Sequence, residues 1–309
     1  MTIAVLGGYG VGITMRVPRM PRAGETVAGG VLTREHGGKA SNQAIAMARW
    51  GSRPVLISAV GDDDEGRAAR ELWSREGVDD SAVITVPDAT MSGIILVDST
   101  GENRIAIAAG ALDSVWGARN EAPAVLRRGA AHTLVISLEI PTAAALQCVA
   151  LAAAAGILVL VNPAPADGVP QDLWAAADLL VPNQSEARTL LEEIGAPIPP
   201  STGPEASDIE VARALAGHCR GAVVMTCGAD GAVIADSDGV RRVAAPAVTV
   251  VDTTGAGDTF VGVLAAEVTA GTDLDVAVER ACRAASHSVT HRGVIAGIPF
   301  RSEIDGVPA

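Results

Sequence analysis

Short apolar runs and helical stretches alternate through most of the sequence, and this alternation most constrains the fold. The runs Leu134–Ser137 and Ile157–Val161, for example, flank the Ala-rich helical stretch Thr142–Ala155. Strands that alternate with helices favour a mainly parallel sheet with helices on both faces. With 309 residues, 49% of them hydrophobic, the chain can bury a large core. We therefore expect a doubly wound α/β fold, as one domain over residues 1–309.

Two early segments do not follow this alternation. Residues 13–33 contain Pro18, Pro21 and Gly24 between short apolar runs, and residues 93–108 contain two such runs around a polar turn. This pattern is typical of edge strands and hairpins. We expect the two segments to form a small β lid over one rim of the main sheet. The lid could also pair with a second copy of the chain, which makes a homodimer plausible.

Composition excludes several classes of partner. The formal net charge is −13, whereas binding to nucleic acid or to an anionic membrane needs a basic surface. The apolar stretch 143–161 is divided by Gly156, which indicates a helix and a strand rather than a membrane span. The N-terminus has no signal-peptide pattern, and the four cysteines form no CxxC pair. We expect a cytoplasmic protein that acts on a small molecule.

Polar residues follow several predicted strands. In parallel sheets, ligands bind beyond the carboxyl ends of the strands. We therefore expect the residues at these positions to converge on one rim: Glu139, Asn162, Asn183, Thr226 and Asp258.

The stretch Val248–Ala270 has the pattern of a strand, a turn and a helix. Val248–Val251 is apolar and β-branched, Thr253–Gly257 is rich in small residues, and a helical pattern follows. The unpaired N–H groups and the dipole at such a helix start favour an anion, most often phosphate. Asp258 in the first turn either caps this helix or takes a proton from a hydroxyl group beside the anion. The spacing alone leaves both interpretations open.

The sequence resembles the ribokinase (PfkB) family of carbohydrate kinases along nearly its whole length. Two segments match the family's C-terminal and N-terminal signatures, and four shorter ones match in order and spacing: Val251–Phe260, Gly37–Ala44, Asn183–Glu186, Gly24–Val27, Asn162–Pro165 and Thr226–Gly228. The resemblance implies a ribokinase-like fold and ATP-dependent phosphorylation of a hydroxymethyl group on a sugar-like molecule.

The resemblance also implies roles for individual residues. Asp258 would be the catalytic base, beside an anion hole formed by Gly255, Ala256 and Gly257. The acceptor would be bound by Gly38, Lys39, Asn42 and Glu139, and ATP by Asn183, Thr226 and Gly228. Glu186 would hold Mg²⁺ through water. A monovalent cation such as K⁺ would lie at Asp252 and Thr254, with backbone carbonyls near Ser288, His291 and Gly293.

Three of these residues also have ordinary structural explanations. Asn42 could cap a helix, Glu186 could be a first-turn acid, and Asp252 could form a turn with its own backbone. For Asn42 the signature favours a site role, and for Asp252 the two explanations are equally supported.

The exit of the first strand departs from the family pattern. Members usually carry Asn and Asp where this chain has Gly10 and Gly12. Hydrogen bonds to a charged group are worth about 1.5–3 kcal/mol each, so a ribose-like polyol would bind less well. We expect Gly10 and Gly12 to leave room for a bulkier or less hydroxylated substrate than ribose, with further contacts from Tyr9, Arg16 or Arg34. The alternatives are a nucleoside kinase of the same family and a catalytically silent sugar-binding regulatory protein.

Overall fold

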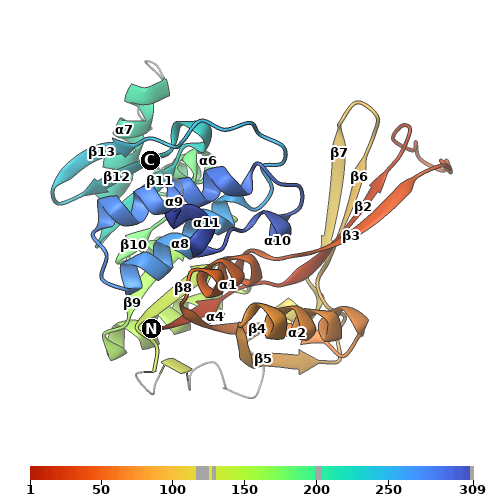
Figure 1. The fold of residues 1–309 in the computed structure, drawn as a ribbon, viewed down its shortest axis with the longest axis horizontal. Coiled ribbons are helices and arrows are strands. Elements are labelled where there is room, and N and C mark those ends of the chain that lie inside the picture. The colour runs from red at the N-terminus through yellow and green to blue at the C-terminus, as the bar shows by residue number, and fades with distance from the viewer. Residues whose placement is uncertain (116–124, 127–129, 199–203, 307–309) are drawn as a thin grey trace.

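The computed structural model describes residues 1–115, 125–126, 130–198 and 204–306, without the side chains of 204–206. Within this part of the chain the strands form two sheets, a large one and a small one (Figure 1). The large sheet has nine strands in the order β13-β12-β11-β10-β9-β8-β1-β4-β5. Their bounds are β1 (Thr2–Leu6), β4 (Arg53–Gly61), β5 (Asp79–Val86), β8 (Thr133–Ser137), β9 (Leu158–Asn162), β10 (Leu179–Leu180), β11 (Ala222–Thr226), β12 (Ala232–Asp236) and β13 (Gly239–Val243).

Most strand pairs of the large sheet are parallel, as the alternation of elements predicts. β5, β4, β1, β8, β9, β10 and β11 pair in parallel, and the hairpin of β12 and β13 adds an antiparallel edge. The parallel strands therefore end on one common side, where polar residues from different strands can meet.

Helices cover both faces of the large sheet. One face carries α1 (Lys39–Arg49), α2 (Asp64–Glu76), α8 (Ala256–Thr269) and α9 (Leu274–Ser288). The other carries α4 (Thr142–Ala155), α5 (Gln171–Trp174), α6 (Gln184–Glu193) and α7 (Pro204–Ala216). The short elements are α10 (Val294–Gly297), α11 (Arg301–Asp305) and the 3₁₀ turns Gly110–Ser114 and Gly228–Asp230.

Side chains of β1 alternate between two cores. Ile3 and Val5 are fully buried among α1, α2, α8 and α9, while Ala4 and Leu6 are fully buried on the face covered by α4 to α7. Because successive side chains of a strand point to opposite faces, a strand buried on both sides needs a continuous apolar run. This requirement explains the run Ile3–Leu6.

The small sheet projects from the body of the molecule (Figure 1). It has the order β3-β2-β6-β7, with bounds β2 (Gly10–Arg16), β3 (Val31–Gly37), β6 (Ser92–Val97) and β7 (Asn103–Ala108). β2 pairs in parallel with β6, and the outer pairs are antiparallel. The two segments predicted as hairpins, 13–33 and 93–108, thus contribute to one sheet, although β2 and β3 extend beyond the first of them.

The strand predicted over Val248–Val251 is wrong. These residues belong to no strand, and Val248, Val250 and Val251 are 41%, 56% and 52% exposed. The N–H groups of Val251 and Asp252 bond instead to the carbonyl of Val289 at the end of α9. A β-branched run predicts an extended backbone, and here that backbone lies against a helix end rather than in a sheet.

The apolar stretch 143–161 forms α4 and β9, with Gly156 in the left-handed conformation between them. In the described ranges, no helix is long and apolar enough to span a membrane. The cysteines of the described residues are all free thiols.

Candidate active site

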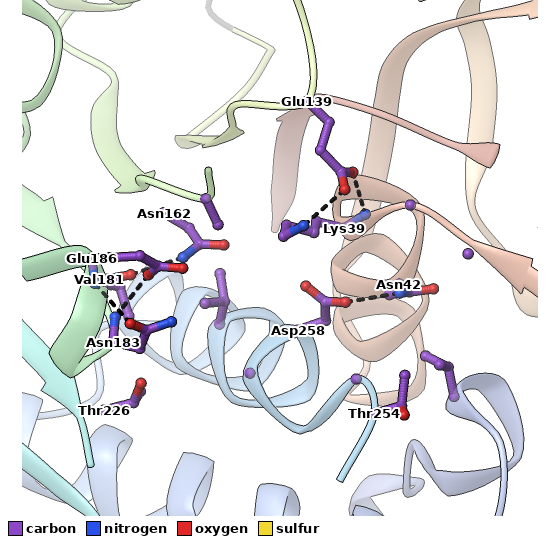
Figure 2. Close-up of a pocket in the computed structure, with 17 residues that line it drawn as sticks. Lys39, Asn42, Glu139, Asn162, Val181, Asn183, Glu186, Thr226, Thr254 and Asp258 are labelled. Carbon is purple, nitrogen blue, oxygen red and sulfur yellow. Dashed lines mark hydrogen bonds and ion pairs between the residues drawn. The ribbon is translucent and has the colours of Figure 1, made fainter. Parts of the chain in front are cut away.

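A cavity of about 390 Å³ lies at the carboxyl ends of the parallel strands (Figure 2). The polar residues predicted to converge at this rim all line it: Glu139, Asn162, Asn183, Thr226 and Asp258. The remaining lining residues come mainly from α1 and from the segments around α6, α8 and α10: Gly37, Gly38, Lys39, Asn42, Ala164, Val181, Glu186, Thr254, Gly255, Gly257, Val261 and Val294. The predicted convergence is confirmed.

Helix α8 begins at the edge of this cavity. Its N-cap, Gly255, has φ 80°, and a Cβ atom there would lie 2.5 Å from Cγ1 of Val294, so this position requires glycine. The first N–H groups of a helix have no acceptor within the helix. One of them, that of Ala256, donates to the carbonyl of Thr253 at 3.3 Å. Gly255 and Gly257 line the cavity, whereas Ala256 lines a neighbouring one.

The Asp258 carboxylate is held by two amide side chains of α1. Asn42 Nδ2 donates to Oδ2 at 2.8 Å, and Gln43 Nε2 donates to Oδ1 at 3.3 Å. Burial raises the pKa of Asp258 to about 6, against the lowering effects of the Asn42 bond and the Lys39 charge. Within the described residues, the hydrogen bonds of the Asp258 carboxylate go to these two amides and not to the first N–H groups of α8, so Asp258 is not a side-chain cap, although it does lie in the first turn, where the helix dipole favours an acid. The Asn42 amide likewise points to Asp258 and does not cap α1.

Lys39, the first residue of α1, forms an ion pair with Glu139 at the same cavity. Lys39 Nζ lies 2.8 Å from Oε1 of Glu139, and the Lys39 backbone N–H donates to Oε2, also at 2.8 Å. Gly38 before them has φ 91°, and a Cβ atom there would lie 2.4 Å from Cα of Tyr9. The start of α1 is therefore packed directly against the exit of β1, which fixes Lys39 in front of Glu139.

Asn183 and Glu186 form a reciprocal capping box at the start of α6. The Glu186 backbone N–H donates to Oδ1 of Asn183 at 2.9 Å, and that of Asn183 donates to Oε2 of Glu186 at 2.8 Å. The ordinary explanation of Glu186 as a first-turn acid therefore holds. Both side chains nevertheless line the cavity, and burial raises the pKa of Glu186.

The Asp252 side chain bonds to the backbone of its own turn, as one of the two explanations of this residue predicts. Its Oδ1 accepts bonds from the N–H and the hydroxyl of Thr254, at 3.0 and 2.7 Å, and its Oδ2 accepts one from the Gly293 N–H at 3.1 Å. These bonds lower the pKa of Asp252, the Thr254 N–H first. Asp252 thus joins the turn before α8 to the loop before α10.

A second, largely apolar cavity of about 530 Å³ adjoins the first, because Thr226 and Gly257 line both. Gly228 lies in its wall. Val248 and Val250 line it too, which accounts for the exposed β-branched run that forms no strand.

The expectation that Gly10 and Gly12, which follow β1, leave room for a substrate is only partly met. Neither Gly10 nor Gly12 lines the first cavity, although Gly10 pairs with Gly37, which does. Room at Gly10 is absent, because a Cβ atom there would lie 2.3 Å from the sulfur of Met91. Space is present at Gly12, where the atom nearest to an added Cβ atom is Cδ1 of Ile95, at 3.7 Å. The space predicted at both positions exists only at Gly12.

Tyr9 and Arg34, two of the three side chains expected to contact the substrate in place of the missing Asn and Asp, bond to other residues. Tyr9 is fully buried, with its hydroxyl 2.7 Å from Nδ1 of His36. Arg34 forms an exposed ion pair with Glu65 at 3.1 Å. The proposed substrate contact of Tyr9 is therefore wrong, because its hydroxyl does not reach the cavity.

Sequence reasoning missed the role of one residue, Gln43. It lies inside the N-terminal signature next to Asn42, but an apolar-periodic helix gives no signal for which polar side chain turns toward a neighbouring helix. Its amide contacts both Asp258 and Asn162.

Comparison with known proteins identifies the family. Residues 10–301 match the model of the pfkB family of carbohydrate kinases. A ribokinase of Schizosaccharomyces pombe is 34% identical, covering 99% of this chain and 97% of that protein, and a deoxyribokinase of Salmonella typhi is 31% identical over 97% and 96%. The structure of Arabidopsis thaliana ribokinase complexed with ribose and ATP has a TM-score of 0.87 at 25% identity, over 98% and 96% of the two chains. The chain therefore belongs to the pfkB family of carbohydrate kinases.

Proposed function

We propose that this carbohydrate kinase transfers the terminal phosphoryl group of ATP to a hydroxymethyl group of a sugar-like acceptor, with Asp258 accepting the hydroxyl proton. The observation that carries the proposal is the position of Asp258, which lines the cavity in the first turn of α8 with both carboxylate oxygens held by amides. Charge that develops on the transferred group would be stabilised by the helix dipole and by the N–H groups of Gly255, Ala256 and Gly257, of which that of Ala256 would have to release its long bond to the Thr253 carbonyl.

The acceptor would lie between Asp258 and the Lys39–Glu139 pair, over Gly38. Oδ1 of Asn42 supports this position, because it is buried without a hydrogen-bond partner among the described residues. An acceptor hydroxyl would satisfy it, which favours a polar substrate at this point.

ATP would occupy both cavities. The apolar second cavity suits a nucleobase, with Gly228 in its wall, and the phosphates would pass Thr226 and Asn183 toward the first cavity. The ATP bound by the Arabidopsis ribokinase supports this assignment.

Charge balance supports a requirement for Mg²⁺. The charged residues that line the first cavity are one lysine and three acids: Lys39, Glu139, Glu186 and Asp258. ATP is itself anionic, so its phosphates need a divalent cation to enter such a cavity. Glu186 fits this cation, since only one of its oxygens is needed for the capping box and the other can hold a metal-bound water.

A monovalent cation such as K⁺ would bind near Asp252 and Thr254, whose turn closes on the Gly293 loop.

The preferred acceptor is less hydroxylated or bulkier than ribose. Gly12 offers no hydrogen-bonding side chain, Met91 fills the space at Gly10 with a thioether, and Ile95 is the nearest side chain to Gly12. These residues do not line the first cavity, so they would meet an acceptor only when the small sheet closes over it; a ring face without hydroxyls would then suit them better than a polyol does. The relative named deoxyribokinase agrees with this proposal, whereas the relatives named ribokinase keep ribose among the candidates. The open space at Gly12 also favours a nucleoside as a second candidate.

The small sheet would act as a lid and as a dimer interface. It carries several of the large exposed apolar side chains of the described residues, among them Val31, Ile94, Ile105 and Ile107, which are 53–69% exposed. Apolar surface of this kind is typical of an interaction site. A kinase that consumes ATP is expected in the cytoplasm, where ATP is made.

The proposal is tested by measuring ATP consumption with a panel of sugars, deoxysugars, sugar acids and nucleosides, with and without Mg²⁺ and with K⁺ or Na⁺. We expect Mg²⁺-dependent turnover with an acceptor other than ribose as the best substrate. Ribose with the highest kcat/KM would overturn the acceptor assignment, and no turnover with any acceptor would overturn the function.

A further inference from the structure

We propose that Gln43 is a positioning residue that orients the Asp258 carboxylate through a chain of amide groups anchored on the backbone carbonyl of Val181. The inference rests on the proposed function, in which Asp258 is the base.

The chain of amides runs from Val181, the residue after β10, to α8. Asn162 Nδ2 donates to the carbonyl of Val181 at 2.9 Å, and Asn162 Oδ1 accepts from Gln43 Nε2 at 3.0 Å. The same Gln43 nitrogen donates to Oδ1 of Asp258 at 3.3 Å. An amide nitrogen carries two hydrogens, so both of its bonds form together. Figure 2 shows Asn162 and Val181 across the cavity from Asp258.

The backbone carbonyl sets the direction of every bond in the chain. A carbonyl only accepts, so the Asn162 nitrogen must face Val181 and the Asn162 oxygen must face Gln43. The Gln43 nitrogen must therefore face Asn162, and from there it also points to Asp258. Gln43 is thus fixed as a donor to the carboxylate rather than free to turn its oxygen toward it.

Close packing of two helices holds Gln43 in this position. Its side chain is fully buried, and a Cβ atom on Gly262 of α8 would lie 2.6 Å from the Gln43 backbone oxygen and 2.5 Å from Cβ of Ala46. Only a glycine lets α8 approach α1 this closely. In the part of the chain that the structure describes, Oε1 of Gln43 is buried without a hydrogen-bond partner. An unsatisfied buried acceptor is unfavourable, so the two bonds donated by Nε2 must outweigh this loss.

Gln43 acts on the ionised form of Asp258 together with three other groups. Asn42 donates to the second carboxylate oxygen, Lys39 supplies a nearby positive charge, and Glu139 supplies a negative one. Burial disfavours the ionised form, and donors aimed at the carboxylate favour it. Loss of the Gln43 donor should therefore raise the pKa of Asp258 and release Oδ1.

The decisive variant is Gln43→Met, which keeps the length and burial of the side chain without a donor. We expect the acid limb of the kcat profile to move up by about one pH unit, the change expected from losing one hydrogen bond to a charged group. Below pH 6, kcat should fall about tenfold, while KM for ATP stays within about twofold, because Gln43 does not line the cavity. The matched control is Gln184→Met, since Gln184 also donates to a carboxylate, that of Asp208, but outside the cavity. It should leave the profile unchanged.

A second measurement does not depend on turnover. Titration of Asp258 by carbon NMR of aspartate-labelled protein should give a higher pKa in Gln43→Met and, through loss of the anchor, in Asn162→Ala. The double variant should match Gln43→Met, because Asn162 acts through Gln43. Should Gln43→Met fail to fold, Asn162→Ala provides the same comparison.

The experiments distinguish failure of the proposed function from failure of the role proposed for Gln43. A wild-type enzyme that phosphorylates no acceptor contradicts the proposed function, and the NMR titration still tests the amide chain. An Asp258 titration and an acid limb that are the same in Gln43→Met and wild type overturn the role of Gln43.

Discussion

The α1–α8 side of the cavity and the small sheet are built in opposite ways. Asn42 and Gln43 are 4% and 0% exposed, and their amide nitrogens are bonded to Asp258. Ile105 and Ile107 of the small sheet are 58% and 69% exposed. Buried hydrogen-bonded groups hold one geometry, whereas an exposed apolar sheet can move or bind a partner. We therefore expect the first region to fix the chemistry and propose that the second selects the acceptor.

The first prediction would break this comparison at its rigid side. Asp258→Asn should lower kcat by about 10²- to 10⁴-fold, the usual contribution of a general base, with a small effect on KM for ATP. Steady-state kinetics with the best acceptor measure it. The exposed Asp113→Asn serves as the matched control and should keep full activity. A loss of less than about fivefold in Asp258→Asn would mean that another group takes the proton.

The second prediction sharpens the comparison at the base of the small sheet. Gly12→Asp should raise kcat/KM for ribose by about 10- to 100-fold if the small sheet closes over the acceptor as proposed, because a carboxylate there would then add charge-assisted hydrogen bonds. Its Cβ atom meets only ordinary contacts, so the variant should fold normally. Gly10→Ala is the contrasting variant, since its Cβ atom would clash with Met91. It should lower Tm, and Met91→Ala should restore part of the loss. A Gly12→Asp enzyme without improved ribose turnover would contradict the assignment.

The third prediction concerns charge in the cavity. Lys39→Met leaves Glu139, Glu186 and Asp258 without the cation that lines the cavity beside them. KM for ATP should rise about tenfold, and high Mg²⁺ should reduce the effect, since the added repulsion is electrostatic. The ATP dependence of the rate at two Mg²⁺ concentrations measures it. An unchanged KM for ATP would show that Lys39 lies outside the path of the phosphates.

The smallest effect is expected at the exposed face of the small sheet. Ile107→Ser should change the free energy of unfolding by no more than about 0.5 kcal/mol if the protein is a monomer, because that side chain is 69% exposed. If the sheet forms the dimer interface, the variant should instead shift the protein toward monomer in sedimentation. A wild-type protein that is monomeric at all concentrations would contradict the dimer.

The sequence predicts the fold well because its signals are periodic. Alternating strands and helices imply the parallel sheet, and residues at strand ends imply the cavity. Prediction from the sequence fails where the same local pattern is compatible with two different structures. Val248–Val251 has strand composition but lines an apolar cavity, and Gly10 predicts space that a distant methionine fills. The direction of the Gln43 amide depends on the carbonyl of Val181, which is far away in the sequence and therefore in no local pattern.

If an ionised Asp258 takes the proton of the acceptor hydroxyl, kcat must depend on pH. Burial raises the pKa of Asp258 to about 6, so the carboxylate is protonated below that pH and ionised above it. We expect kcat to rise with pH, about tenfold per unit below pH 6, and to level off above pH 7, and we expect Asp258→Asn to show no such rise. A wild-type rate that is constant between pH 5 and 8, or an equal limb in Asp258→Asn, would contradict it.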